Sequence, residues 1–165
     1  FEVTGLKTGS TSIAKYCLSA TAKKDGVELI AAIMAAPDYK ARFADAAALL
    51  NYGYSICRLY EDPDPPVLPS MPVEGGVEEQ TGLVYDGAFS YLSTDGEDFG
   101  TIERILKLEE TLKAPVEAGQ KAGILEYRLQ GEKIGEIPVV TETAVRQADY
   151  PDYLKRLVLA WLTGL

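Results

Sequence analysis

Five prolines crowd the stretch 58–72, and they constrain the fold of this chain more than any other feature. They are Pro63, Pro65, Pro66, Pro69 and Pro72. Proline fixes the backbone angle φ and has no N–H to donate, so helices and central strands do not run through such a stretch. The 165 residues are enough for two small domains. We therefore predict one domain at residues 1–58, a second at 59–149 and a terminal segment at 150–165.

The first domain has the pattern of a three-stranded antiparallel sheet covered by one helix. Apolar runs at Tyr16–Ala22 and Val27–Ala35 flank the turn sequence Asp25-Gly26, which predicts a hairpin, with residues 3–9 as a third strand. The second run has little polar alternation, so we expect both of its faces to be covered. Asp38 is expected as the N-cap or as an acidic residue in the first turn of a helix that ends near residue 57. Its expected apolar face comprises Phe43, Ala47, Leu50, Tyr54 and Cys57.

The second domain consists of short apolar runs separated by turn residues. Gln130-Gly131-Glu132 is typical of a hairpin turn, and Leu125, Tyr127 and Leu129 alternate with charged residues. The pattern predicts a small β-sandwich. The expected strands are 83–85, 88–92, 102–108, 123–129 and 133–140.

The terminal segment begins with Tyr150-Pro151-Asp152, a helix start with proline in an early position. The helix could pack on the sandwich or lie on a membrane surface, where a tryptophan beside basic residues is common. At about fifteen residues it is too short to span a bilayer. Its apolar stripe comprises Leu154, Leu157, Val158, Trp161, Leu162 and Leu165.

Charge and composition exclude several classes of function. The net charge of −9 argues against a nucleic-acid partner, and the charge is uneven: residues 1–58 carry +2, residues 59–150 carry −12. The chain has no histidine, which excludes a Ser-His-Asp triad and a histidine-ligated metal within it. Cys17 and Cys57 form no metal or redox motif; we expect free buried thiols, with a disulfide as the alternative.

The motif with chemical meaning is Lys7-Thr8-Gly9 on the first strand. Lys-Thr-Gly is one of three signature motifs of serine penicillin-binding proteins and β-lactamases. The longer run 5–18 resembles the third motif of the low-molecular-mass D-alanyl-D-alanine carboxypeptidases, the peptidase S11 family. The run Lys113–Val116, with Gly119 and Gly123, resembles the C-terminal β-domain of the same family.

The resemblance implies an α+β fold. Its parts are a three-stranded antiparallel portion of a penicillin-binding/β-lactamase-like sheet with one helix, a small all-β sandwich domain, and a C-terminal amphipathic helix. It also implies removal of the terminal D-Ala from a peptidoglycan pentapeptide stem through an acyl-serine intermediate, with no cofactor. The implied location is extracytoplasmic, in the cell wall or periplasm, attached to the outer face of the cytoplasmic membrane through residues 151–165. β-Lactam antibiotics are the implied inhibitors.

The same resemblance implies the roles of the motif residues. Lys7 takes part in proton transfer and charge stabilisation, and Thr8 hydrogen-bonds the terminal carboxylate of the substrate. Gly9 lets the substrate backbone approach closely. The backbone N–H of Ser10 is one oxyanion donor, and Thr11 continues the substrate-binding motif.

Arg42 falls where the resembling proteins place an arginine near the substrate carboxylate. A guanidinium fork suits a carboxylate in geometry and in charge. The alternative is a solvated arginine on an exposed helix face, and the residues leave both readings open.

The nucleophile of that family is predicted to be absent from this chain. Asn51 is the only asparagine, and Leu49 stands two residues before it, so a Ser-x-Asn motif is missing. Ser12-Ile13-Ala14-Lys15 has the spacing of the nucleophile motif, but that motif needs a helix N-terminus and this string connects two predicted strands. We therefore expect the C-terminal part of an enzyme, inactive alone.

Two other functions remain open at this stage. One is a non-catalytic cell-wall binding or scaffold module with a vestigial Lys-Thr-Gly strand, and the other is a β-lactamase-related enzyme. The long β-domain after the helix argues against the second. We also expect either a homodimer of this chain or tight binding of the N-terminal part of the enzyme when the two are co-expressed, because the helix at 38–57 can cover only one face of an apolar sheet.

Overall fold

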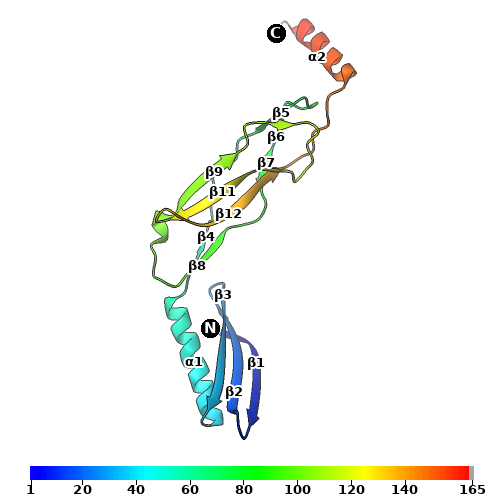
Figure 1. Ribbon diagram of the computed structural model, residues 1–165. Coiled ribbons are helices and arrows are strands. Elements are labelled where there is room, and N and C mark those ends of the chain that lie inside the picture. The colour runs from blue at the N-terminus through cyan, green and yellow to red at the C-terminus, as the bar shows by residue number, and fades with distance from the viewer. Residues whose placement is uncertain (164–165) are drawn as a thin grey trace. The chain divides into compact units, whose positions relative to one another are not determined.

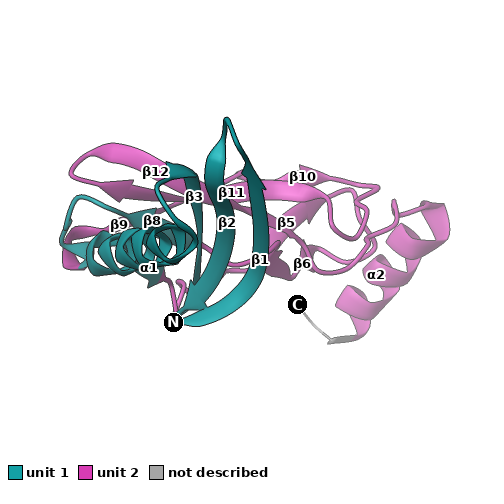
Figure 2. Ribbon diagram, turned by 90° about the horizontal axis from the view of Figure 1, so that it is seen from below, with its two compact units in different colours: residues 1–60, 90–99 teal, residues 61–89, 100–165 magenta. Residues whose placement is uncertain are grey.

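The computed structural model describes residues 1–163, with side chains as far as Leu162. The expected place of Leu165 on the terminal stripe lies outside the described residues. The chain forms two compact units (Figures 1 and 2): residues 1–60 with 90–99, and residues 61–89 with 100–165. The predicted α+β architecture of sheet, helix, sandwich and terminal helix is confirmed.

The sheet of the first unit contains three antiparallel strands in the order β1-β2-β3. Their bounds are β1 Glu2–Thr11, β2 Lys15–Lys24 and β3 Val27–Ala36. The β2–β3 turn has Asp25 at φ 49° and Gly26 at φ 80°, the left-handed pair that a two-residue hairpin turn favours. The predicted hairpin is therefore confirmed, and β1 is an edge strand.

Helix α1, Tyr39–Ile56, begins where the sequence predicts. The Asp38 carboxylate accepts hydrogen bonds from the N–H groups of Lys40 at 2.7 Å and Ala41 at 2.9 Å, which makes it the N-cap. The buried residues of the helix are Ala46 and Leu50. The prediction is confirmed for Leu50 and for Tyr54, which packs against the core, but it is wrong for Phe43 and Ala47, and it missed Ala46.

Phe43 and Ala47 lie at the exposed edge of that buried face. The centre of the helix packs on an alanine-rich part of β2 and β3, where the small side chain of Ala46 permits close approach. The bulky ring of Phe43 fits only at the rim. The core of this unit comprises Leu18, Ala20, Ala22, Ala31, Ile33, Ala36, Ala46 and Leu50.

The other face of the sheet is bare among the described residues. Ile30 is 72% exposed and Met34 is 82% exposed, although both belong to the apolar run of β3. The expectation that both faces of β3 are covered is wrong for this chain, because α1 reaches only one of them (Figure 2).

A two-stranded ladder that the sequence did not reveal joins β4, Arg58–Glu61, to β8, Ser90–Ser93. The ring of Phe99, at the start of the short 3₁₀ helix η1, Phe99–Thr101, lies edge-on to Tyr60 and Tyr91. These contacts explain why residues 90–99 group with the first unit rather than with the sandwich.

The second unit is the predicted sandwich. One sheet has the order β10-β5-β6 and the other β7-β12-β11-β9. The strands are β5 Met71–Glu74, β6 Gln80–Thr81, β7 Leu83–Tyr85, β9 Glu103–Leu108, β10 Leu112–Lys113, β11 Lys121–Leu129 and β12 Glu132–Thr141. Both sheets contribute to its core, which comprises Met71, Val73, Leu83, Leu112, Val116, Ala122, Val139 and Val145.

The proline-rich segment is held to the sandwich by a buried carboxylate. Asp62 accepts hydrogen bonds from the Tyr127 hydroxyl at 2.8 Å and from Arg104 at 3.2 Å. The Tyr127 ring is fully buried and stacks on Phe89, with 3.8 Å between ring centroids. A buried charge needs such partners. Asp62 therefore holds the segment in place, although its prolines donate no backbone hydrogen bonds to a sheet.

Helix α2, Tyr150–Thr163, closes the described chain. Asp149 and Asp152 hydrogen-bond each other's backbone N–H groups, at 3.2 and 3.0 Å, which is the reciprocal arrangement of a capping box. None of the helices in the described part of the chain is both long and apolar enough to cross a membrane.

We expect the chain to self-associate through the bare face of the first sheet. Several hundred Å² of apolar surface rarely stays wet on a soluble monomer, since its burial contributes roughly 25 cal/mol per Å². Light scattering of a gel-filtered sample at micromolar concentration should report a dimer. Met34→Lys should shift it to monomer, whereas Val67→Lys, at a 95% exposed site elsewhere, should not. A monomeric wild type contradicts the expectation.

A second prediction concerns the ion network on the outer side of the four-stranded sheet. The Glu126 side chain is buried under Lys107, at 2.7 Å, and Arg128. Hydrogen bonds from Lys107 and Arg128 lower the pKa of Glu126 to about 2, from an ordinary 4.5. A depressed pKa stabilises the fold above the unfolded-state pKa, so this contribution should be lost as the pH falls from 4.5 towards 2.

The measurement is the melting temperature of the second unit as a function of pH. Glu126→Gln should flatten the profile in that window. Glu132→Gln, at the exposed first residue of β12 and without an ion pair among the described residues, should leave it unchanged. If the melting temperature depends on pH in the same way in wild type and in Glu126→Gln, the ion network of Glu126 makes no contribution to acid sensitivity.

Candidate functional site

The Lys7-Thr8-Gly9 motif lies in the second half of the edge strand β1, and the strand pairing sets which way each residue faces. Lys7 pairs with Ser19, and Ser19 with Ala32, so the three lie in one row across the sheet. Ser19 and Ala32 are exposed, and they lie on the face that α1 does not cover. Lys7 therefore belongs to the bare face.

Thr8 belongs to the opposite face. It pairs with Leu18, and Leu18 is 3% exposed because it packs beneath α1. The alternation of a strand thus separates the ammonium of Lys7 from the hydroxyl of Thr8. A shallow hollow of about 330 Å³ lies beside Lys7, and the other residues that line it are Thr8, Gly9, Cys17, Leu18, Ser19, Ala32, Ile33 and Met34.

The two glycines of the motif strand differ in what their missing side chains leave free. A Cβ on Gly5 would lie 2.7 Å from the Thr21 hydroxyl, so internal packing requires that glycine. A Cβ on Gly9 would meet nothing within 4 Å. The packing of this chain therefore does not explain Gly9, and the open space beside it leaves room for a ligand backbone.

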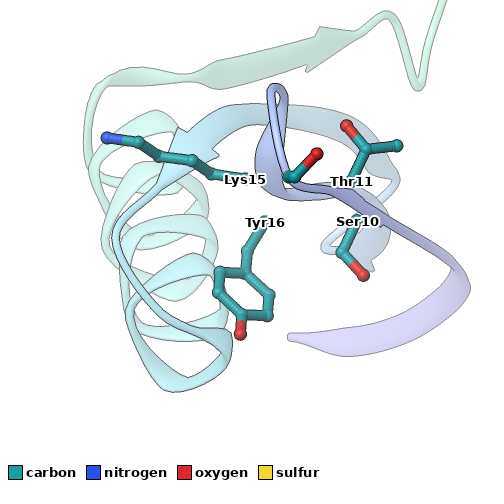
Figure 3. Close-up of a pocket in the computed structure, with 5 residues that line it drawn as sticks. Ser10, Thr11, Lys15 and Tyr16 are labelled. Carbon is teal, nitrogen blue, oxygen red and sulfur yellow. The ribbon is translucent and has the colours of Figure 1, made fainter.

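Ser10 and Thr11 end β1 beside a second hollow, of about 470 Å³ (Figure 3). The Thr11 hydroxyl accepts the Ala14 N–H at 2.9 Å, so it shapes the β1–β2 turn. Ser10 pairs with Tyr16, whose ring forms part of the same hollow. Sequence reasoning missed Tyr16; the only signal for it was the register of the β1–β2 hairpin.

Arg42 lies in the first turns of α1 and reaches the end of the motif strand. Its Nη1 donates to the carbonyl oxygens of Gly9 at 3.5 Å and Cys17 at 3.4 Å. The guanidinium also lies over the rings of Tyr16, at 5.6 Å, and Phe43, at 5.0 Å. Its Nε is buried without a hydrogen-bond partner, so this cation has donor capacity that the described chain does not use.

The predicted site residues thus lie along β1 and at its α1 side. The structure brings Arg42 to Gly9, while Lys7 faces the bare hollow and Ser10 and Thr11 the neighbouring one. Cys17 and Cys57 are both free and half-buried, so the alternative of a disulfide between them is wrong. Cys17 was not expected at the site, yet it lines the Lys7 hollow.

The Ser12-Ile13-Ala14-Lys15 string occupies the turn between β1 and β2. Its serine is therefore not at a helix N-terminus, and its lysine begins the next strand with a left-handed φ of 52°. The spacing that places a lysine one helical turn above a serine does not exist here.

Comparison with known proteins assigns both parts of the chain to one class, the penicillin-binding proteins. Residues 64–147 match the family model described as penicillin-binding protein 5, C-terminal domain, and residues 1–38 match that of D-alanyl-D-alanine carboxypeptidase. The chain belongs to the penicillin-binding protein 5 family of D-alanyl-D-alanine carboxypeptidases.

Curated relatives and solved structures agree with this assignment. The chain is 31% identical over 162 residues to D-alanyl-D-alanine carboxypeptidase DacF of Bacillus subtilis, covering 96% of this chain and 41% of the relative. It is 28% identical over 169 residues to DacA of Escherichia coli, covering 97% and 41%. The chain thus spans less than half the length of these relatives.

Among solved structures, penicillin-binding protein 5 of Haemophilus influenzae superposes with a TM-score of 0.67 at 26% identity, covering 88% of this chain and 43% of that one. A peptidoglycan synthesis regulatory factor, PBP3, of Streptococcus pneumoniae shares the fold, with a TM-score of 0.58 at 21% identity and the same coverage.

We predict that this chain alone forms no covalent adduct with a fluorescent penicillin, because its one Ser-x-x-Lys string lies in a turn. Gel electrophoresis after boiling should show no labelled band for the wild type. A band that disappears in Ser12→Ala would identify that serine as the nucleophile. A band that persists in Ser12→Ala would reveal another.

Proposed function

We propose that this chain supplies one wall of the active site of a serine D-Ala-D-Ala carboxypeptidase, which trims the terminal D-Ala of peptidoglycan stem peptides. The observation that carries the proposal is the edge strand β1, with Lys7 on an uncovered face and open space over Gly9. An edge strand offers unpaired N–H and C=O groups to an extended peptide. The acyl-accepting serine would come from outside this chain.

In this proposal the two faces of β1 have different tasks. Lys7, on the bare face, provides positive charge and a proton route beside the acyl-serine centre. Thr8 lies on the helix side, as Arg42 does. Together they suit the terminal carboxylate of the stem peptide, because a guanidinium and a hydroxyl both donate hydrogen bonds to a carboxylate.

Ser10 and Thr11 take substrate-binding roles at the end of the strand. The backbone N–H of Ser10 is one donor to the oxyanion that forms as the acyl-serine intermediate is made and hydrolysed. The Thr11 side chain holds the turn that ends the strand through its bond to Ala14. β-Lactam antibiotics, which resemble the acyl donor, are the proposed inhibitors.

The proposal includes attachment to the outer face of the cytoplasmic membrane through α2. The apolar stripe of this helix is exposed as far as it is described, with Leu157 69% and Trp161 84% exposed. A short helix with one apolar face and an exposed tryptophan suits the plane of a lipid interface. The implied location of the enzyme is extracytoplasmic.

In the intact enzyme, Lys7→Ala should lower peptide turnover by ~10²-fold or more, comparable to the loss of an oxyanion donor. Penicillin acylation and D-Ala release provide the two rates. Lys23→Ala, an exposed lysine near the other end of the sheet, is the matched control and should keep wild-type rates. Wild-type turnover in Lys7→Ala would show that Lys7 takes no part in the reaction.

Arg42→Ala should weaken transition-state binding of the peptide by ~1–3 kcal/mol, the range for a hydrogen bond to a charged group. The expected effect on kcat/KM should be larger for a substrate with a free C-terminal carboxylate than for its amide. Lys40→Ala removes an exposed charge from the same helix turn and serves as the control. Equal losses on acid and amide would assign Arg42 to supporting Gly9 alone.

A further inference from the structure

Helix α2 carries two basic residues, and the structure shows that one of them is already engaged. Arg156 Nη2 donates to the carbonyl oxygen of Gly76 at 2.9 Å and to that of Val77, and its Nη1 lies 3.8 Å from the Glu79 carboxylate. These acceptors belong to the loop between β5 and β6 of the sandwich. The guanidinium charge is therefore directed at the protein rather than at solvent.

The loop that receives Arg156 is itself packed against the chain segment leading into α2. Gly76 forms a bridge with Gln147, and Val77 donates to the Arg146 carbonyl at 3.0 Å. A Cβ on Gly76 would lie 2.6 Å from Val145, so a side chain there would separate the two segments. The polar side of α2 is thus tied to the sandwich at its base.

The tie leaves the apolar stripe on the far side of the helix. Trp161 lies five residues after Arg156, an offset of about 140° around the axis at 100° per residue. The described stripe is exposed along its length, and its members are Leu154, Leu157, Val158, Trp161 and Leu162. Nothing in the described chain covers it.

The remaining charges near α2 do not favour an anionic surface. Asp152 is paired with Arg146, through two contacts at 2.7 and 2.8 Å. Lys155 is the basic residue of the described helix that forms no ion pair. The exposed carboxylates of Glu78 and Glu79 stand next to the Arg156 contact, and the whole chain carries −9.

We infer that α2 binds a lipid surface of low charge by burying its apolar stripe, without recognition of anionic headgroups. The inference rests on the proposed membrane attachment and specifies its partner. Polybasic anchors gain roughly fivefold in binding per basic residue near an anionic surface. Lys155 is the one basic residue of the described helix without an ion pair, and the exposed Glu78 and Glu79 lie beside the Arg156 contact, so we expect that gain to be offset.

The tie to the sandwich has a second consequence for binding. Because Arg156 and the capping residues are held by the protein, inserting the stripe requires no release of a salt bridge. Binding should therefore be insensitive to salt, which screens charge interactions but leaves apolar burial intact.

The test measures co-sedimentation of the 165-residue chain with two kinds of vesicle. One is phosphatidylcholine alone, and the other contains ~30% phosphatidylglycerol, an anionic lipid. We expect binding to the anionic vesicles to be equal or weaker. We also expect no loss of binding when salt rises from ~50 to ~500 mM, where the Debye length falls several-fold.

Three variants separate apolar from headgroup binding. Trp161→Ala should weaken binding about tenfold on both vesicles, since it removes a large apolar group from the stripe. Arg156→Ala and Lys155→Ala should stay within about twofold of wild type on both. Circular dichroism checks that each variant keeps its helix.

Two results would overturn the inference in distinguishable ways. Binding that is about fivefold or more tighter on anionic vesicles, falls with salt and weakens in Arg156→Ala would show headgroup recognition; the attachment itself would then stand. Failure to sediment with either vesicle, with the stripe instead mediating association between copies of the chain, would remove the membrane attachment as well.

Discussion

The close packing of α1 on one alanine-rich face of the three-stranded sheet is the contact on which the candidate site depends. Ala20, Ala22 and Ala31 present little bulk, so the helix approaches closely and buries Ala46 and Leu50 against them. The Tyr54 hydroxyl adds a hydrogen bond to the Ala22 carbonyl. This contact lets the first turns of α1 bring a guanidinium to the end of β1. It also leaves the other face, where Lys7 lies, open.

The sequence predicted this unit well where the signal was local. The Asp25-Gly26 turn, the Asp38 cap and the spacing of the apolar runs each act over a few residues, and each appears in the structure. The centre of the buried face of α1 was missed because Ala46 and Ala47 look alike in an apolar pattern. Only the shape of the sheet decides which of two adjacent alanines is buried. The β4–β8 ladder depends on pairing across about thirty residues, which no local pattern reports.

For the candidate site too, local features were predicted and contacts between distant parts of the chain were not. The motif Lys7-Thr8-Gly9 could be recognised because its chemistry is local to one strand. The resemblance implied that Arg42 lies near the substrate carboxylate, with a solvated arginine as the alternative. The structure shows that Arg42 contacts the Gly9 carbonyl, without showing what ligand it binds. Tyr16 carried no motif, and it joins the site through hairpin register and through its ring beneath the guanidinium. Whether Thr8 and Arg42 act on one carboxylate remains a proposal that follows from their shared side of β1.

The distribution of charge links the sandwich to the site and to the terminal helix. Residues 59–150 carry −12, yet the chain up to residue 58 carries +2, so the unit with Lys7 and Arg42 is the one that can hold a carboxylate. An acidic sandwich repels both an anionic peptide and an anionic bilayer. Under the proposed function, this charge distribution favours the substrate at β1 over the sandwich surface, and it favours apolar contact as the means of membrane attachment. The engagement of Arg156 by backbone carbonyls is consistent with the proposed apolar attachment, because this arginine is not free in the way that the basic residues of a polybasic anchor are.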